Sequence, residues 1–249
     1  MHHALVVGYH HAGVPPPGVR HRYHVSAGAL RGHVLSLRAR GYVFTTVSEA
    51  LTATAERVAC LTFDDGYVDN HAVALPVLRE LGVVATVFVV SGDIGRRGLR
   101  WPEERPGVAA ADIMSWDELD DLEAAGWEIG SHGHQHRRLA RMTPEEQRDQ
   151  LARSFVTLAG RLRHPPRSLA FPYGSYSRTT LEAARAVGFR VAATTRRGRV
   201  LPGDDPFQLR RVSAHGTRPW HVAERWKLAL AGRGLYPLRA AALEVQGPW

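Results

Sequence analysis

Thr62-Phe63-Asp64-Asp65-Gly66-Tyr67 is the stretch from which the rest of this chain can be understood. It follows the short apolar run Val58–Leu61, which is typical of a buried strand. Adjacent carboxylates at the end of a strand are costly to bury unless positive charge lies beside them, and Gly66 permits a sharp turn there. The hexapeptide alone fits two interpretations equally well. One is a solvated Asp-Asp-Gly turn, and the other is a metal site in which one Asp is a ligand and its neighbour remains free as a base.

A second stretch, Ser131-His132-Gly133-His134-Gln135-His136, favours the metal site. His132 and His136 are four residues apart, a spacing that puts both side chains on one face of a helical turn. Together with Asp65 they offer two nitrogens and one oxygen, which leaves a fourth position open as catalytic sites require. His134 is off that face and is expected behind the ligands or at the surface. We therefore predict that Asp65, His132 and His136 bind one divalent metal, with zinc favoured and cobalt, nickel or manganese as alternatives.

Short apolar runs alternate with helical patterns along the chain, which is the signal for repeated βα units. Helix starts are predicted at Ser26, at the capping box Ser115–Glu118 and at Thr143-Pro144. A last helix is expected over 220–231. The pattern predicts a single α/β domain over residues 1–249, with seven or eight parallel strands in a barrel.

The residues able to carry chemistry each follow one of the predicted strands: His10, Asp64, Asp65, His132, His136, Tyr173 and His215. In parallel barrels the carboxyl ends of the strands form the active site, so these side chains are expected at one edge. The long loop 92–111, which contains Trp101, is also expected to line a site, because loops of that length are uncommon otherwise. The Trp101 ring either stacks on a sugar or belongs to the core.

A metal in such a site lowers the pKa of water, and Asp64, adjacent to the ligand Asp65, is placed to take the proton. A backbone N–H at Tyr173 is a candidate donor to the developing oxyanion. A histidine must then protonate the leaving amine, and His10 and His215 are both candidates. Either histidine could equally be a polar residue at the rim of the barrel.

Composition narrows the class of protein. The chain has 249 residues, 44% of them hydrophobic, which suits a globular domain. The formal charge is +8, but Lys227 is the only lysine and the arginines are scattered. No motif points to nucleic acid, so no nucleic-acid partner is expected, although an anionic substrate or carrier stays open. The single cysteine, Cys60, excludes an internal disulfide and is expected in the core.

No apolar run is long enough to span a membrane, and the N-terminus lacks the pattern of a signal peptide. We therefore expect a cytoplasmic protein without stable membrane insertion. The sequence makes no prediction of the oligomeric state.

Three motifs in this order resemble the polysaccharide deacetylases, also called NodB-homology or carbohydrate esterase family four proteins. They are Thr62–Gly66, Ser131–His136 and Phe171-Pro172-Tyr173-Gly174, and the resemblance extends from Tyr9-His10 to Leu209–Val212. It implies a distorted barrel with fewer than eight regular strands. It also implies removal of N-acetyl, sometimes O-acetyl, groups from sugars with a divalent metal, usually zinc. By the same likeness Asp64 is the base, and Asp65, His132 and His136 are the ligands.

The chain departs from the family pattern at two places. Many members begin the third motif with an Arg that orients the base, whereas this chain has Ala170 there. That matches a branch with Pro-Tyr-Gly and an N-terminal Tyr-His, as in Tyr9-His10. The usual late Leu-x-His is also absent, and the nearest match is Ser213-Ala214-His215. The resemblance therefore favours His10 over His215 as the acid.

The leading hypothesis is a metal-dependent hydrolase acting on an N-acetylated sugar or glycoconjugate. Two alternatives stay open: a metal hydrolase of a non-sugar amide or imide, and a catalytically silent carbohydrate-binding module. The second alternative is disfavoured because Asp64, Asp65, His132 and His136 are all present.

Overall fold

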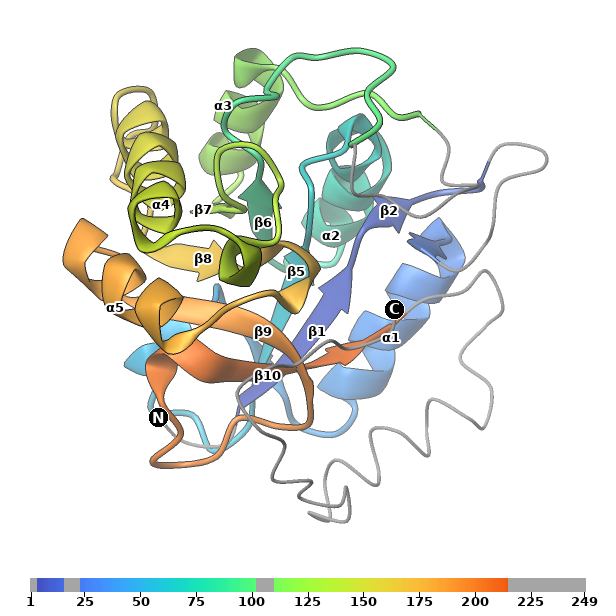
Figure 1. The fold of residues 1–249 in the computed structure, drawn as a ribbon. Coiled ribbons are helices and arrows are strands. Elements are labelled where there is room, and N and C mark those ends of the chain that lie inside the picture. Colours follow the sequence, from blue (N-terminus) through green and yellow to red (C-terminus); the bar gives the residue numbers. More distant parts are fainter. Residues whose placement is uncertain (1–3, 16–22, 102–109, 215–249) are drawn as a thin grey trace.

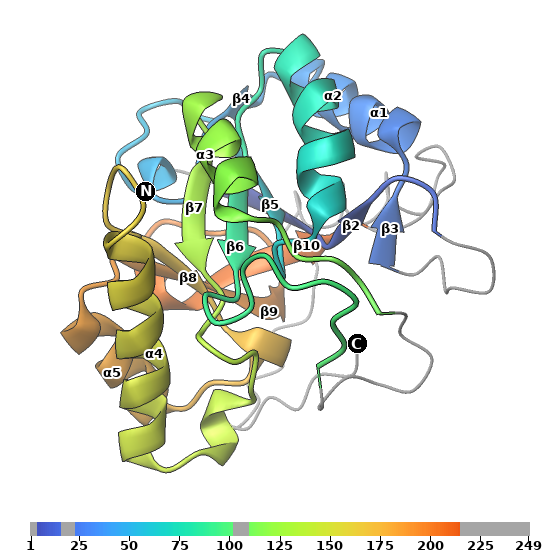
Figure 2. The ribbon, with the colours of Figure 1, turned by 90° about the horizontal axis from the view of Figure 1, so that it is seen from above.

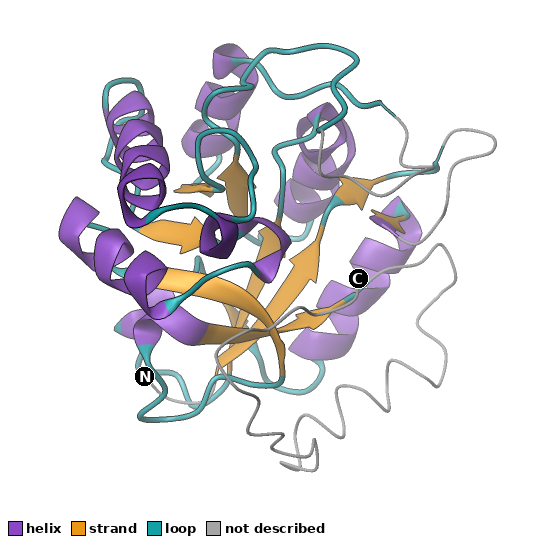
Figure 3. Ribbon diagram, in the orientation of Figure 1, coloured by secondary structure: helices purple, strands orange, loops and turns teal. Residues whose placement is uncertain are grey.

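A closed barrel of parallel strands forms the centre of the molecule (Figures 1 and 3). The computed structural model describes residues 4–15, 23–101 and 110–214. Within these residues seven strands pair in the order β1-β10-β9-β8-β7-β6-β5, and β5 pairs back to β1. They are β1 (Ala4–Tyr9), β5 (Val58–Phe63), β6 (Thr86–Val89), β7 (Glu128–Ser131), β8 (Ser168–Ala170), β9 (Val191–Arg197) and β10 (Leu209–Ser213). The predicted barrel of about seven parallel strands is confirmed.

Three short strands lie outside the barrel. β4 (Val43–Phe44) pairs with the first residues of β5, while β6 pairs with the last residues of β5 on the same side. β2 (His11–Ala12) and β3 (His24–Val25) form a separate parallel pair. The barrel is therefore distorted only locally, at β5, where β4 and β6 pair with different parts of the same edge.

Helices lie around the outside of the strands (Figure 2). They are α1 (Ala27–Arg38), α2 (Leu75–Glu80), α3 (Trp116–Ala124), α4 (Pro144–Ala159) and α5 (Arg178–Val187). The predicted starts are confirmed: Ser26 caps α1, and Ser115 and Thr143 form capping boxes with Glu118 and Glu146. The helix expected over 220–231 lies outside the described residues.

Single turns complete the described elements. A π turn, η3 (Asn70–Ala74), leads into α2. The 3-10 turns are η2 (Glu49–Leu51), η4 (Leu139–Arg141), η5 (Pro172–Gly174) and η6 (Pro206–Gln208). None of the helices among these residues is long and apolar enough to cross a bilayer.

Side chains alternate between the inside and the outside of the barrel, as the two-residue period of a strand requires. On β5, Val58 and Cys60 belong to an inner cluster, whereas Leu61 and Phe63 pack outward with residues of α1 and α2. Cys60 is fully buried, and burial raises the pKa of its thiol. The cysteine is therefore a core residue, as predicted, and not a nucleophile.

Parallel register brings the carboxyl ends of the strands to one edge. Gly8 pairs with Thr62 on one side and with Ser213 on the other, and Val89 pairs with Ser131. The segments that follow β1, β5, β7 and β8 consequently leave the barrel side by side, which positions the candidate site.

Candidate active site

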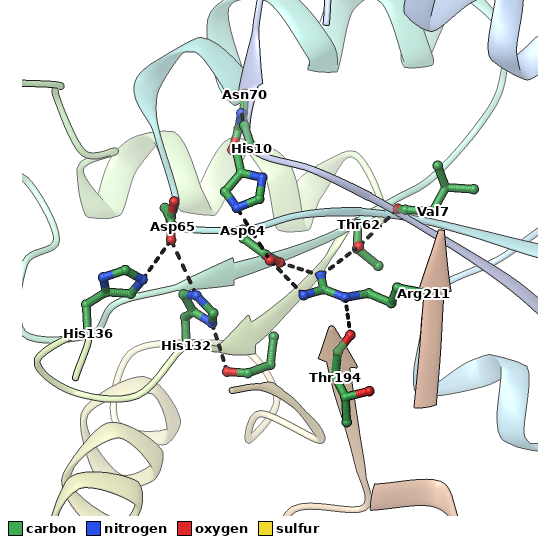
Figure 4. Close-up of polar contacts among 11 residues, drawn as sticks. Val7, His10, Thr62, Asp64, Asp65, Asn70, His132, His136, Thr194 and Arg211 are labelled. Carbon is green, nitrogen blue, oxygen red and sulfur yellow. Dashed lines mark hydrogen bonds and ion pairs between the residues drawn. The ribbon is translucent and has the colours of Figure 1, made fainter. Parts of the chain in front are cut away.

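The two adjacent aspartates point to different partners (Figure 4). Asp65 adopts a left-handed backbone with φ 78°, and Gly66 follows with φ 77°. A Cβ added to Gly66 would lie 3.0 Å from a methyl of Val89, so this turn requires glycine for its φ angle and for its space. The turn directs Asp65 toward the histidines, while Asp64 stays over the barrel.

Asp65 converges with His132 and His136 in a buried group. The Asp65 Oδ1 atom lies 3.3 Å from His132 Nε2 and 3.2 Å from His136 Nε2. His132 Nδ1 donates to the carbonyl oxygen of Ala170 at 2.8 Å, so Nδ1 carries its proton. In a neutral His132 the Nε2 lone pair then faces a carboxylate oxygen, which is repulsive unless a positive charge lies between them. Because two imidazoles meet the same oxygen, the set fits a divalent cation.

The pKa shifts of Asp65 and His132 are also consistent with a cation site. Burial alone would raise the pKa of Asp65, but His136 and His132 hold it well below its ordinary value. Burial lowers the pKa of His132, yet its bonds to Asp65 and the nearby Asp64 raise it on balance. The group is thus built around an ionised carboxylate, the form that binds metal.

Asp64 is held by an arginine that the sequence did not single out. Arg211 Nη1 and Nη2 donate to the two Asp64 oxygens at 2.7 and 2.8 Å, and both side chains are buried. Arg211 also donates through Nε to Thr194 O at 3.0 Å and through Nη1 to Thr62 Oγ1 at 3.3 Å. Burial raises the pKa of Asp64, but Arg211 and His132 lower it on balance. Asp64 is therefore a fixed, ionised carboxylate.

The partner of Asp64 comes from a distant part of the chain. The Asp64–Arg211 contact joins residues 147 positions apart, so no local pattern predicts it. The only signal in the sequence was the pair Arg210-Arg211 in the last predicted strand, and the pair does not indicate which carboxylate it meets.

His10 lies on the other side of Asp64. Its Nε2 is 4.0 Å from Asp64 Oδ2, and its side chain is partly exposed. The Asn70 side chain donates to the His10 carbonyl at 2.8 Å, which fixes the main chain there. Burial lowers the pKa of His10, against the opposing effect of Asp65 and Asp64. His215, the other candidate acid, lies outside the described residues.

Tyr173 reaches the site from the turn η5 with φ 57°. Its ring lies 4.6 Å from the His136 ring, and the Arg138 guanidinium lies 4.1 Å from the Tyr173 ring. A Cβ on Gly174 would lie 2.0 Å from Thr195 Oγ1, so glycine is required beside Tyr173. The turn is thus shaped by packing.

His134 is half-buried and hydrogen-bonds through Nδ1 with Ser91 Oγ at 3.0 Å. It stands apart from Asp65, His132 and His136, as predicted.

Backbone conformation marks the same residues independently. Within the described ranges the non-glycine residues with positive φ are Asp65, His136 and Tyr173. Such conformations are unfavourable for residues with a Cβ and concentrate at functional sites. All three belong to the group of predicted site residues.

A second cluster, His11, His24 and Asp69, also brings three potential ligand atoms within 4.8 Å of one another. The His11 and His24 rings are stacked, with centroids 4.4 Å apart and planes 7° apart. Imidazole lone pairs lie in the ring plane, so parallel stacked rings cannot both aim at one ion. His11 Nδ1 instead bonds to Asp69 Oδ2 at 2.7 Å, and the cluster holds the chain after β1.

The chain is similar to known proteins of one family. The family profile described as "Polysaccharide deacetylase" matches residues 52–192. The chain is 28% identical over 186 residues to the putative polysaccharide deacetylase YxkH of Bacillus subtilis (strain 168), covering 72% of this chain and 62% of that protein. It is 21% identical over 218 residues to the poly-beta-1,6-N-acetyl-D-glucosamine N-deacetylase of Staphylococcus aureus (strain MRSA252), covering 82% and 72%.

Solved structures match the fold. The structure of IcaB from Ammonifex degensii superimposes with a TM-score of 0.73 at 23% identity, covering 94% of this chain and 98% of that one. At that identity the match concerns the arrangement of the barrel and its helices.

Proposed function

Because the chain belongs to the polysaccharide deacetylase family, we propose that it is a metal-dependent N-deacetylase of an amino sugar or glycoconjugate. The observation that carries the proposal is the separation of the two aspartates. Asp65 meets two imidazoles, and Asp64 meets a guanidinium and a third imidazole. This difference in partners supports Asp65 as a metal ligand and Asp64 as the base.

In this proposal Asp65, His132 and His136 hold one divalent cation. Two imidazoles and one carboxylate suit zinc best, and cobalt, nickel or manganese are the alternatives. An ion held there would supply Lewis acidity, which would lower the pKa of water and polarise the acyl oxygen.

Asp64 accepts the proton of the attacking water. Its carboxylate is kept ionised and oriented by the paired hydrogen bonds from Arg211, so no side-chain rearrangement precedes proton transfer. The Tyr173 backbone N–H donates to the acyl oxygen as negative charge develops there.

Because burial lowers the pKa of His10, the proton that it donates to the departing amine nitrogen is the one that Asp64 took from the attacking water. The 4.0 Å from His10 Nε2 to Asp64 Oδ2 is too long for a direct hydrogen bond but suits transfer through one water molecule. His215 remains the second candidate for this step.

The substrate class follows from the family and from the S. aureus relative, which by its name deacetylates poly-beta-1,6-N-acetyl-D-glucosamine. We propose an N-acetylated amino-sugar polymer or conjugate for this chain. If no N-acetylated sugar releases acetate in the test below, non-sugar amides are the next substrates to try.

The test combines metal content with acetate release from N-acetylhexosamine oligomers. Asp64→Asn is expected to keep the metal and to lose activity by about 10²-fold or more, because it removes the base and spares the ligands. Asp120→Asn, an exposed change of the same kind on α3, should match wild type. His10→Ala and His215→Ala, compared in the same assay, identify the acid by the larger loss.

Two results would contradict the proposal. A wild type that binds no metal when metal is supplied removes its central premise. A wild type that binds metal and releases no acetate from any amino sugar removes the substrate class and leaves amides and imides to be tried.

A further inference from the structure

The two candidate imidazole ligands are held in different ways. His132 is fixed through Nδ1 by the carbonyl of Ala170. The Nδ1 atom of His136 is buried and has no hydrogen-bond partner among the described residues. Metal-binding histidines almost always donate this second N–H to an acceptor, which sets the orientation of the ring. His136 must therefore be oriented by something else.

Aromatic packing supplies that orientation. The Trp101 ring lies 4.3 Å from the His136 ring at 43°, and the Tyr173 ring lies 4.6 Å away at 49°. His136 itself has a left-handed backbone with φ 48°, so its main chain is not in a relaxed conformation. Ring contacts thus replace the missing hydrogen bond.

Trp101 is itself anchored. Its Nε1–H donates to Asp93 Oδ2 at 2.8 Å, and Arg96 Nη1 donates to Asp93 Oδ1 at 2.8 Å. Trp101 is 4% exposed and packs in a small cluster with Tyr67 and Ile113. The indole is therefore buried in the protein, and its face is not available to stack on a sugar ring.

The anchor is joined to the histidine segment by main-chain bonds. Ser91 N donates to Gly133 O at 3.1 Å, and Gly92 N donates to His134 O at 3.0 Å. A Cβ on Gly92 would lie 2.4 Å from His134 O, so the two segments touch closely. The segment that carries Asp93 and the segment that carries His136 are consequently held together. Trp101 contacts both, because it donates to Asp93 and packs against the His136 ring.

We propose that Trp101, anchored by Asp93, is a positioning residue that keeps the His136 imidazole aimed at Asp65 and so retains the metal. The inference rests on the metal centre of the proposed function. Packing fixes the plane of the His136 ring without adding an acceptor for its Nδ1–H. Loss of Trp101 therefore weakens metal retention through the freedom gained by this ring, while the base Asp64 stays in place.

The experiment measures Co²⁺ affinity by chelator competition and the visible spectrum of bound Co²⁺, which reports ligand geometry. Trp101→Ala is expected to weaken Co²⁺ binding by about 10- to 100-fold, the usual effect of losing a residue that orients a ligand, and to change the spectrum. Trp116→Ala is the matched control, because that indole packs at the start of α3 beneath the Arg161 guanidinium. It should leave affinity and spectrum unchanged.

Two further variants keep the test sharp if Trp101→Ala folds poorly. Trp101→Phe retains a ring beside His136 and should bind Co²⁺ more tightly than Trp101→Ala and less tightly than wild type. Asp93→Ala removes the anchor and leaves the indole, and it should also weaken binding. Circular dichroism establishes that each variant is folded.

The outcomes separate the two proposals. If wild type binds one Co²⁺ and all folded Trp101 and Asp93 variants bind it equally well with the same spectrum, the positioning role is wrong and the metal centre stands. If wild type binds no metal, the proposed function fails and the positioning role fails with it.

Discussion

A change of backbone conformation at one residue gives two neighbouring carboxylates different tasks. Thr62 and Asp64 continue the inward face of β5, whereas the left-handed φ at Asp65 turns the next side chain toward the histidines. Arg211 then neutralises Asp64, and the imidazoles face Asp65. Two like charges on adjacent residues are tolerated because each has its own positive partner.

Arg211→Lys tests the arginine that the sequence did not reveal. Lysine cannot donate to both Asp64 oxygens from a planar fork, so the proposed base, Asp64, loses its fixed orientation. One charge-assisted hydrogen bond is worth about 1.5 to 3 kcal/mol. We therefore expect a loss of roughly 10- to 100-fold in kcat, with metal content unchanged, measured by acetate release and metal analysis.

Arg210→Lys is the control for this change, because Arg210 is the neighbouring residue and its Nε atom lies 3.8 Å from Asp204 Oδ2. It should retain wild-type kcat. Equal activity of Arg211→Lys and wild type would show that the paired hydrogen bonds do not orient the base.

The predictable residues are those whose partners are fixed by local sequence. His132 and His136 share one short segment, and Asp64 and Asp65 are adjacent, so spacing was sufficient to group them. Arg211 depends on the register between β10 and its neighbours, which includes a shift between Leu209 and Arg211. The residues around Arg211 do not by themselves predict that register.

Two glycines of α1 and its C-terminal end test how backbone conformation affects the stability of a single element. Gly32 lies within α1, and a Cβ added there would meet no atom within 4 Å. Gly32→Ala should raise the free energy of unfolding by about 0.5 to 1 kcal/mol, because alanine favours the helix and restricts the unfolded chain. Urea denaturation measures the change.

Gly41, just after α1, is the matched comparison. A Cβ there also meets nothing within 4 Å, but its φ is 78°. Gly41→Ala should therefore lower the free energy of unfolding by about 1 kcal/mol, since the left-handed region is unfavourable for alanine. If both variants shift stability in the same direction, backbone conformation is not the deciding factor.

The sequence predicted whether a segment is a helix or a strand better than it predicted the residues at which the element begins and ends. Capping residues located the starts of α1, α3 and α4, because those signals act within one turn. The apolar run 83–90 has the length of a long strand, yet β6 covers only Thr86–Val89. Leu75 and Leu78 have helical spacing, yet the helical segment that contains them begins earlier, with the π turn Asn70–Ala74. In both cases contacts with neighbouring elements decide where the regular hydrogen-bond pattern begins and ends. The hydrophobic pattern of the sequence does not indicate these limits.

Barrel closure is a property of the whole chain. β1 pairs along six residues with β5 and along two residues with β10. The alternation of strands and helices predicts a parallel sheet, but an open sheet and a closed barrel have the same local pattern. Closure places Asp64 and Arg211 opposite each other, so the orientation of the Asp64 carboxylate depends on the complete fold.

Global stability should depend on pH through His33, which lies on α1 outside the barrel. It is 2% exposed, its Nδ1 hydrogen-bonds with the Tyr9 hydroxyl at 2.9 Å, and burial lowers its pKa from 6.5 to about 4. The unfolded chain therefore takes up this proton more readily than the folded protein between these two values. The contribution of neutral His33 to stability is fully present above pH 6.5 and is lost as the pH falls toward about 4.

His33→Asn isolates this contribution, because asparagine keeps a polar group near Nδ1 and does not titrate. On lowering the pH from about 7.5 to about 5, wild type should lose about 2 kcal/mol more unfolding free energy than the variant does. His164→Asn, an exposed change, should follow wild type. The variant is expected to be less stable than wild type near neutral pH, so the decisive quantity is the slope with pH. Equal slopes for wild type and His33→Asn would mean that α1 and β1 separate or admit water without global unfolding, which would let the buried imidazole protonate within the folded protein.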